Sequence, residues 1–364
     1  MVIGLLKCKE ESLVGLTPSV VSKLKKEGHD IVFELGAGND SDYADEEYLN
    51  AAATSLERKE VIAKSDILVT VSGLDTDDLS VIGENTYVVG KFNTNVALIE
   101  KLKNHRIKAF SLDLLPRSTI AQSMDVLSSL ASLSGYKSII SAAENFAGYF
   151  PMMTTSAGTI PPAKVLVLGA GVAGLQAIAT AKRLGAVVEA FDVRSSVKEE
   201  VQSLGAKFIE VEGSQEDASA GGYAVKQSEA YILKQKELIH ASATKADVIV
   251  TTAAIPGRKA PLLIEDRTVS SMKKGSVIVD LAAATGGNCA LTQNDQIVEV
   301  EGVTIIGDSR LYNKMGKQAS LVYSNNVFSF LKFVFKEGLE NIPHDHEIVS
   351  KTLLTSIQQE AVSA

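Results

Sequence analysis

One strand-turn-helix-strand unit near the middle of the chain constrains the fold more than any other feature. Residues 164–168 (KVLVL) have strand character and lead directly into the glycine-rich turn 169–174 (GAGVAG). A helical pattern follows and ends at Gly185, and a second strand-like run, 187–191, leads into Asp192. This order and spacing are those of the dinucleotide-binding fingerprint. A chain built around such a unit is expected to form a parallel sheet with helices on both faces.

The glycines and the acid of this unit have distinct physical roles. Gly169 permits the tight turn, Gly171 lets the backbone approach a pyrophosphate, and Gly174 lets helix and strand pack closely. The helix N-terminus adds unpaired N–H groups that attract phosphate. Asp192 lies 23 residues after Gly169, where a carboxylate accepts hydrogen bonds from the adenosine ribose and repels a 2′-phosphate. Glycine clusters also form plain turns, but here strand, helix, second strand and acid are in register, so we predict an NAD(H) site.

The rest of the chain repeats the alternation of strands and helices. At 364 residues it is too long for one ordinary core and suits two α/β domains. Ahead of the fingerprint the predicted strands are 2–6, 30–34, 66–71, 86–89 and 107–110. From the fingerprint onward they are 164–168, 187–191, 207–211, 248–252, 276–280 and 303–306. The predicted fold class is α/β, with two Rossmann-like doubly wound parallel-sheet domains and a cleft between them.

Segments with helical spacing and no strands are predicted where the chain passes from one domain to the other. Residues 120–150 predict one long helix, and a loop bracketed by prolines follows at 151–162. Helical patterns without intervening strands resume at 318–336 and 347–359, and we expect them to return and pack on the first domain. The predicted domains are 1–127 plus 308–364 for the first, and 128–307 for the NAD(H)-binding Rossmann domain.

Composition excludes several classes of partner. The formal net charge of −8 and the lack of a long Lys/Arg block argue against nucleic-acid binding. Cys8 and Cys289 belong to no C-x-x-C pair, so neither a disulfide framework nor a zinc site is predicted. His344 and His346 would point to different sides of a helix, so no metal site is predicted there. With no apolar run near the roughly 20 residues of a membrane helix, we expect a soluble chain in a reducing compartment.

Several short segments carry a more specific resemblance. They are 116–117 (PR), 121–125 (AQSMD), 180–186 (TAKRLGA), 192–194 (DVR) and 221–224 (GGYA). Together they resemble the NAD(H)-binding domain of the proton-translocating nicotinamide nucleotide transhydrogenase family, and the resemblance extends over nearly all of the chain. The related alanine dehydrogenases share the fold and a fainter version of the pattern.

The resemblance implies which residues meet the cofactor. Arg117, Gln122, Asp125 and Ser128 match family residues that reach across the cleft to the nicotinamide end, and with Tyr223 they form the implied catalytic set. From the residues alone, Gln122 and Asp125 equally fit a role in capping the long helix. The cofactor-binding residues implied by the fingerprint and the resemblance together are Gln122, Ser123, Met124, Asp125, Gly169, Ala170, Gly171, Val172, Gly174, Asp192, Val193, Arg194, Gly222, Tyr223, Gln235 and Ala254.

Other parts of the site follow the same resemblance. The segment 213–223, rich in Gly, Ser, Glu and Asp, is predicted to be a mobile loop that closes on bound nucleotide through Gly222 and Tyr223. Gln235 lies on the next predicted helix, and residues 252–257 follow a strand at the carboxyl edge of the sheet, where nucleotides bind.

The chain departs from both related families at particular positions. The transhydrogenase family usually has an Arg where Ile120 stands and a Pro-Ser-Arg segment where 312–314 (YNK) falls, so those family roles are not transferred. Alanine dehydrogenases have an Arg where Leu13 stands and a His near 91–93 (KFN), where none of the five histidines lies. Amino-acid oxidation is therefore disfavoured.

The function implied by the resemblance is NAD(P)+ transhydrogenation, active only with partner subunits. Hydride would pass from NADH on this chain to NADP+ on a partner, so positioning of two nicotinamides, not acid/base catalysis, would carry the step. The implied partners are the NADP(H)-binding and membrane-spanning transhydrogenase subunits and a second copy of the chain in a homodimer. The implied location is the cytoplasm or a matrix-like compartment, peripheral to a membrane. Two alternatives stay open: an alanine dehydrogenase-like oxidoreductase and a catalytically silent NAD(H)-binding regulatory subunit.

Overall fold

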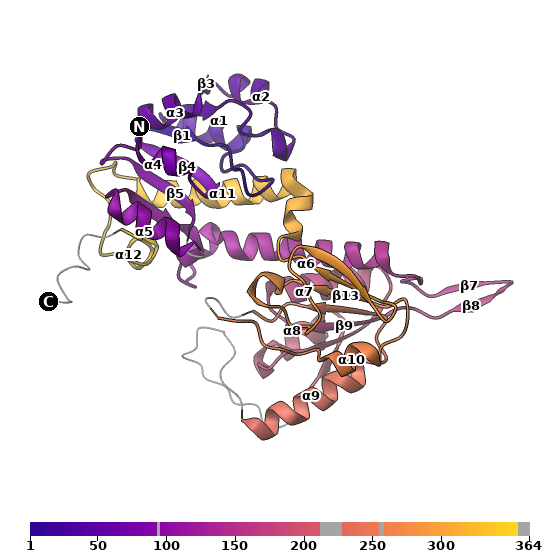
Figure 1. The fold of residues 1–364 in the computed structure, drawn as a ribbon. Helices are drawn as coiled ribbons and strands as arrows, with labels where there is room; N and C mark the ends of the chain where they lie inside the picture. Colours follow the sequence, from indigo (N-terminus) through magenta and orange to yellow (C-terminus); the bar gives the residue numbers. More distant parts are fainter. Residues whose placement is uncertain (93–94, 212–227, 255–257, 356–364) are drawn as a thin grey trace. The chain divides into compact units, whose positions relative to one another are not determined.

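Two compact units make up the protein. The computed structural model describes residues 1–92, 95–211, 228–254 and 258–355. Unit 1 comprises Met1–Leu130 and Asn313–Ala364, and unit 2 comprises Ala131–Tyr312. Each unit is built on a parallel sheet with helices packed against it (Figure 1), which confirms the predicted α/β class. No helix of the described residues is long and apolar enough to cross a membrane.

Unit 1 contains a six-stranded sheet in the order β3-β2-β1-β4-β5-β6. All of its neighbouring strands pair in parallel. The strands are β1 (Val2–Leu5), β2 (Asp30–Glu34), β3 (Thr54–Leu56), β4 (Ile67–Ser72), β5 (Tyr87–Lys91) and β6 (Lys108–Ser111). The helices of this unit are α1 (Pro18–Lys26), α2 (Asp45–Asn50), α3 (Arg58–Lys64), α4 (Thr76–Leu79), α5 (Val96–Asn104), α11 (Gly316–Val334) and α12 (Glu347–Thr352). The strand order reverses between β1 and β4, which defines the switch point of a doubly wound sheet.

Successive side chains of the unit 1 strands enter opposite cores. Val32 of β2 joins a cluster with Val61 of α3, whereas the next residue, Phe33, stacks on Tyr48 of α2 at a ring distance of 5.0 Å. Because strand side chains alternate between faces, both faces of this sheet are covered by helices. Helix α11 also packs against α1.

Unit 2 contains a seven-stranded sheet in the order β11-β10-β9-β12-β13-β15-β14, and only β14 runs antiparallel to its neighbour. The strands are β9 (Lys164–Leu168), β10 (Val187–Phe191), β11 (Lys207–Ile209), β12 (Val248–Thr251), β13 (Val277–Asp280), β14 (Gln296–Val300) and β15 (Val303–Gly307). The helices are α7 (Val172–Arg183), α8 (Lys198–Ser203), α9 (Glu229–Ala243) and α10 (Asp266–Ser270). The strand order reverses between β9 and β12.

The central strand β9 shows why this sheet is buried on both faces. Val165 and Val167 join a core with Ile178 of α7, and Leu166 joins the opposite core with Ile239 of α9. A near-continuous apolar strand is the pattern of a parallel sheet with helices on both sides. The register aligns the ends of β9 and β10, so the two turns that follow them lie at the same sheet edge.

The predicted long helix is shorter than expected. A 3-10 turn, η3 (Ala121–Met124), comes first, and α6 (Val126–Asn145) begins only after Asp125. Asp125 interrupts the pattern because its carboxylate caps the new helix, accepting hydrogen bonds from the amide and the hydroxyl of Ser128. The prediction of one helix over 120–150 was therefore wrong at both ends.

The predicted proline-bracketed loop contains a small hairpin. Strands β7 (Met153–Thr155) and β8 (Gly158–Ile160) pair in antiparallel fashion, and every residue in them is exposed. The hairpin extends away from the sheet of unit 2 (Figure 1). It lacks the alternation of buried and exposed positions from which strands are predicted. Strand β3, only three residues long, and the antiparallel edge strand β14 were missed too.

Candidate functional site

Two of the three glycines between the end of β9 and the first turn of α7 have no room for a side chain. Gly169 has a positive φ of 101°, and a Cβ there would lie 2.5 Å from the hydroxyl oxygen of Thr252. A Cβ on Gly174 would lie 1.8 Å from the carbonyl oxygen of Gly169. These contacts press the start of α7 closely against the end of β9, as the fingerprint requires.

The third glycine faces open space. Among the described residues, no atom lies within 4 Å of the position that a Cβ on Gly171 would occupy. Gly171 is also the N-cap residue of the twelve-residue helix α7, and it has no side chain to cap the helix. The amides of the first turn are thus left for a ligand, and the positive end of the helix dipole favours an anion there. The surroundings of this glycine fit a dinucleotide pyrophosphate.

Asp192 lies next to this turn at the end of β10 and is held by four donors. Its Oδ1 accepts hydrogen bonds from the amide and the Nε of Arg194, each at 2.9 Å. Its Oδ2 accepts from the amide of Ala170 at 2.7 Å and from Nη2 of Arg194 at 2.8 Å. The hydrogen bonds to Asp192 raise the pKa of the Arg194 guanidinium. Asp192 therefore lies at the end of β10, and its carboxylate is already bonded to Ala170 and Arg194.

Residues 252–254, which follow β12, lie next to the turn at Gly169. The Thr252 hydroxyl donates to the carbonyl of Gly169 at 3.0 Å. The carboxamide of the fully buried Asn288 accepts from the amide of Ala253 at 3.0 Å and donates to its carbonyl at 2.8 Å. Asp280 in turn accepts from the amide of Asn288 at 2.7 Å. Asn288 and Asp280 were not predicted; the acid at the end of a buried strand and the Gly-Gly-Asn that follows it were the available signals.

The remaining residues predicted in unit 2 divide into described and undescribed ones. Gln235 lies on α9 and is 8% exposed, so its side chain faces the protein interior. Ala254 follows β12 and is exposed. Tyr231, also on α9, has its pKa raised by burial and by the negative charge of Asp192. Gly222 and Tyr223 lie outside the described residues.

The nicotinamide-end residues implied by the resemblance all belong to unit 1 and surround η3. Gln122 and Ser123 are exposed, whereas the side chain of Met124 is buried. The carbonyl of Ser123 accepts a hydrogen bond from Asn326 of α11 at 2.8 Å, so the returning helix fixes this turn. Gln122 therefore presents its carboxamide to solvent, as a ligand contact requires.

Asp125 and Ser128 form a closed pair at the start of α6. The Asp125 carboxylate accepts from the Ser128 amide at 2.9 Å and from its hydroxyl at 2.6 Å. The alternative role of Asp125 as a helix cap is thus realised in the structure. Arg117, which precedes η3, is exposed.

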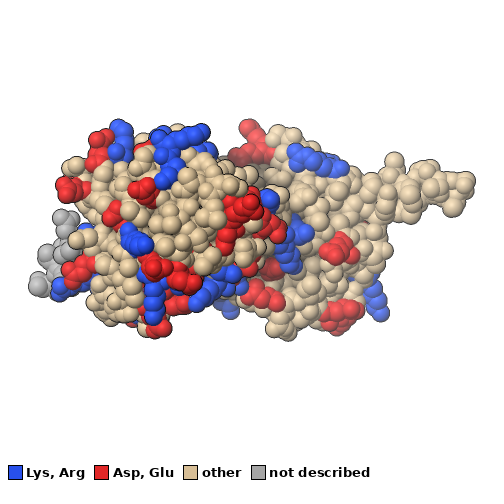
Figure 2. Space-filling model, turned by 90° about the horizontal axis from the view of Figure 1, so that it is seen from above, with Lys and Arg blue, Asp and Glu red and all other residues tan. Residues whose placement is uncertain are grey.

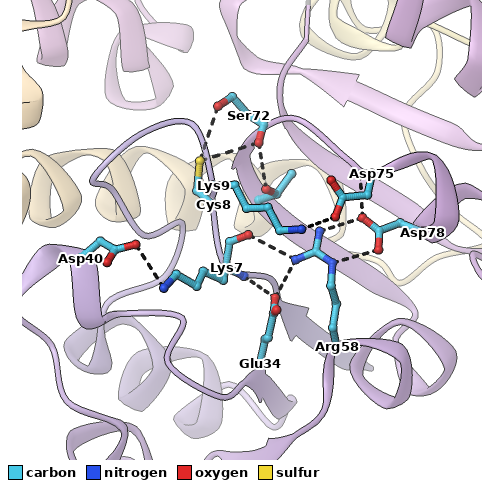
Figure 3. Close-up of polar contacts among 10 residues, drawn as sticks. Lys7, Cys8, Lys9, Glu34, Asp40, Arg58, Ser72, Asp75 and Asp78 are labelled. Atoms are coloured by element: carbon cyan, nitrogen blue, oxygen red, sulfur yellow. Dashed lines mark hydrogen bonds and ion pairs between the residues drawn. The ribbon is translucent and has the colours of Figure 1, made fainter.

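The carboxyl edge of the unit 1 sheet is closed by an ion network (Figure 3). Arg58 donates from Nε and Nη2 to Asp78 at 2.8 and 2.7 Å, and from Nη1 to Glu34 at 2.7 Å. The amide of Lys7, just after β1, donates to the same Glu34 oxygen at 2.7 Å, and its ammonium pairs with Asp40 at 3.2 Å. Burial opposes the charge of Arg58, but the carboxylates of Asp78 and Glu34 outweigh it and raise the pKa of the guanidinium.

Comparison with known proteins assigns the family. The model described as "Alanine dehydrogenase/PNT, N-terminal domain" matches residues 7–134, and the model described as "Alanine dehydrogenase/PNT, C-terminal domain" matches residues 138–361. The chain belongs to the alanine dehydrogenase/PNT family. Within this family assignment, the N-terminal model ends inside α6 and the C-terminal model starts a few residues later in the same helix.

Individual members of the alanine dehydrogenase/PNT family differ in their similarity to the chain. An NAD(P) transhydrogenase alpha-subunit chain of Rhodospirillum rubrum is 42% identical, with 97% of this chain and 92% of that protein covered. The crystal structure of transhydrogenase from Sinorhizobium meliloti matches with a TM-score of 0.89 and 39% identity, covering 98% of both chains. Alanine dehydrogenase 1 of Staphylococcus aureus is 24% identical, with 93% of this chain and 88% of that protein covered. These matches confirm the resemblance to transhydrogenase alpha subunits.

Proposed function

We propose that the chain is the NAD(H)-binding component of a proton-translocating nicotinamide nucleotide transhydrogenase. The observation that carries the proposal is the turn at Gly171, where a helix N-terminus faces open space beside an acid at the end of β10. Relatives named as transhydrogenase alpha subunits support the reaction class. The reaction would form NADPH on a partner subunit. It would be coupled to proton movement across a membrane.

In this proposal the residues of unit 2 bind and orient the cofactor. The amides at the start of α7 hold the pyrophosphate, and Gly171 leaves room for it. Asp192 lies at the adenosine ribose, with Val193 and Arg194 beside it. Residues 252–254, which Asn288 holds through Ala253, form another wall of the proposed site. Bound NADH would supply the hydride.

From the family resemblance, we assign the nicotinamide end of the cofactor to residues of the η3 segment of unit 1. The exposed carboxamide of Gln122 can pair with the carboxamide of the nicotinamide through complementary donor and acceptor atoms. Asp125, bonded twice to Ser128, holds the segment at the start of α6. Arg117 contributes a positive charge. None of these roles is proton transfer, which agrees with a direct passage of hydride between two nicotinamides.

Partner subunits complete the proposal. The NADP+ that accepts the hydride would lie on an NADP(H)-binding subunit, and a membrane-spanning subunit would couple the reaction to proton movement. The chain would therefore work at the surface of a membrane, in the cytoplasm or a matrix-like compartment.

The β7–β8 hairpin is the proposed dimerisation element. Its residues are all exposed, and the preceding Met152 and the terminal Ile160 are 65% and 42% exposed. The hairpin carries no charged side chain, and its projecting end is free of both colours in Figure 2, whereas acidic and basic side chains are interspersed elsewhere on that face. A lone two-stranded hairpin is marginally stable in water, so packing against a second copy would stabilise it.

Light scattering tests the dimer. Replacing Met152 and Ile160 together by Ser should lower the molecular mass in solution from dimer to monomer. Leu262, 47% exposed outside the hairpin, provides the control, because Leu262→Ser should leave the mass unchanged. A doubly substituted protein that stays dimeric would contradict the role of the hairpin.

The alanine dehydrogenase alternative finds less support. Leu13, at the position where the resemblance implies an Arg in those enzymes, is 2% exposed and lies in the core. Lys91 pairs with the buried Glu11 at 2.9 Å. Position 13 therefore offers no cation for a substrate carboxylate, because it holds a buried apolar side chain.

One assay separates the three functions. The purified chain is mixed with a transhydrogenase NADP(H)-binding domain, and NADH-dependent reduction of a thionicotinamide NADP analogue is followed. Turnover only with both proteins supports the proposal, whereas NADH binding without turnover favours the silent regulatory subunit. NADH oxidation by the chain alone with a 2-oxo acid and ammonia would identify an amino-acid dehydrogenase instead.

A further inference from the structure

The fingerprint acid has no spare hydrogen-bonding capacity in this structure. An ionised carboxylate offers about four acceptor positions on its two oxygens. Asp192 accepts four hydrogen bonds, two on each oxygen. Two of the donors are main-chain amides, of Ala170 and Arg194, and the other two are Nε and Nη2 of the Arg194 guanidinium. A ribose hydroxyl can reach Asp192 only if the guanidinium gives up a position.

The guanidinium is the part of this group that solvent reaches first. The side chain of Arg194 is 23% exposed, against 7% for Asp192. Both nitrogens that bind Asp192 belong to the same planar fork, in the geometry with which Arg also binds phosphate. The carboxylate therefore occupies the donors that a 2′-phosphate on the adenosine ribose would use.

From this geometry, and resting on the proposed NAD(H) site, we infer that Asp192 rejects a 2′-phosphate by holding Arg194. Arg194 is then a latent 2′-phosphate receptor, because its Nε and Nη2 donors become available to a phosphate when the Asp192 charge is lost. The inference goes beyond repulsion by the acid alone. Simple repulsion predicts that removing Asp192 abolishes discrimination, whereas a released guanidinium predicts a preference that depends on Arg194.

A four-way comparison of variants tests the inference. Wild type, Asp192→Asn, Arg194→Gln and the double variant are titrated by calorimetry with NADH and NADPH, and with 5′-AMP and 2′,5′-ADP as probes of the adenosine half. Asp192→Asn should improve the affinity for 2′,5′-ADP relative to 5′-AMP by about 10- to 100-fold, the effect of a charged hydrogen-bonding partner. The double variant should lose this gain, and Arg194→Gln alone should discriminate against the 2′-phosphate at least as strongly as wild type.

Controls test whether the gain in affinity requires the Arg194 guanidinium and not any nearby positive charge. They also test whether each variant is folded. Lys198 lies four residues beyond Arg194 and pairs with Glu210 at 2.6 Å. Asp192→Asn combined with Lys198→Gln should keep the gain, because that cation is not part of the fork. Asp192→Ser provides a second removal of the charge, and circular dichroism checks that each variant is folded.

The outcomes distinguish this inference from the proposed function. Wild-type protein that binds neither NADH nor 5′-AMP contradicts the proposed function itself. Wild-type protein that binds NADH, with no gain for 2′,5′-ADP in folded Asp192→Asn and Asp192→Ser, contradicts only the inference. A gain that survives in the double variant also overturns it, since the receptor would then not be Arg194.

Discussion

The two parallel sheets of this protein reverse their strand order at the same point of the topology, but the chemistry at the two carboxyl edges differs. In unit 2 the edge between β9 and β12 contains a glycine turn, with open space at Gly171. In unit 1 the corresponding edge between β1 and β4 is crossed by the Arg58 ion network. Ligands bind at switch points of such sheets, so both edges are candidate sites by topology alone.

The comparison shows that topology proposes a site and local side chains decide whether it is open. At the unit 1 edge, Arg58 is bound by two carboxylates and by the Lys7 carbonyl. The exposed Lys9 pairs with Asp75. Each of these cations is thus matched by an acid within the protein. The amides at the start of α7, in contrast, have no capping side chain among the described residues. Two units with the same sheet topology can thus differ at this edge. Unit 1 carries a structural ion network, and unit 2 carries the proposed cofactor site.

The largest expected effect is on the stability of unit 1. Arg58→Met leaves Asp78 and Glu34 without their partner, and the side chains of the three residues are only 17%, 6% and 15% exposed. Removing one partner of such a buried network should lower the free energy of unfolding by about 3 kcal/mol. NADH affinity should be unchanged. Hydrogen exchange followed by mass spectrometry would locate the loss in unit 1.

The matched control for this prediction is an exposed pair at the same edge. Lys9 and Asp75 are 60% and 47% exposed, so Lys9→Met should cost less than about 1 kcal/mol. Equal losses for the two variants would show that the Arg58 network has no special role in closing the edge. A loss of NADH binding in folded Arg58→Met would contradict the assignment of this edge as structural.

The second effect concerns the close contact in unit 2. Gly174→Ala would place a methyl group 1.8 Å from the carbonyl oxygen of Gly169, so the turn or α7 must move. Overpacking of this kind should lower the free energy of unfolding by about 2 kcal/mol and weaken NADH binding as well. Thermal unfolding and NADH titration on the same samples would measure both losses. Full NADH affinity in this variant would imply that the fingerprint turn is not the cofactor site.

The fold was predictable where strands are buried on both faces. The predicted strands 30–34, 164–168 and 187–191 agree residue by residue with β2, β9 and β10. Their apolar runs are bounded by turns, and the pattern is local. The hairpin β7–β8 and the three-residue β3 were missed, because exposed or very short strands leave no periodic apolar signal in the sequence.

The candidate site was predictable only where its geometry is local. The roles of Gly169 and Gly174 follow from a turn of six residues, and the Cβ distances agree with the expected tight turn and close packing. The pairing of Asn288 with Ala253 spans 35 residues, so it requires the fold. Arg194 is two residues from Asp192, yet its fork on that acid depends on a side-chain conformation that the sequence does not specify.

The third effect separates binding from stability at the open edge. Gly171 has ordinary backbone angles (φ −80°), and a Cβ there would meet no atom of the residues that the structure describes within 4 Å. Gly171→Ala should therefore leave thermal unfolding unchanged. The added methyl group would occupy space proposed for the pyrophosphate, so the Kd for NADH should rise about tenfold, or about 1.4 kcal/mol. Unchanged affinity, measured by NADH fluorescence in a protein without Trp, would mean that phosphate does not approach this residue.

The smallest effect is a pH dependence that only the closed edge should show. Burial opposes the charge of Asp78, but its hydrogen bonds from Arg58 and from the Asp75 amide lower its pKa below the ordinary 3.8. A carboxyl whose pKa is lowered by folding stabilises the protein above its unfolded pKa, and this stability is lost as pH falls through the folded pKa. Between pH 5 and pH 3 the loss should be at most about 1 kcal/mol. Asp78→Asn should remove this part of the pH dependence, as measured by hydrogen exchange in unit 1, while the exchange of unit 2 amides keeps the wild-type profile. An identical pH profile in wild type and Asp78→Asn would show that the pairing with Arg58 contributes no stability to the closed edge.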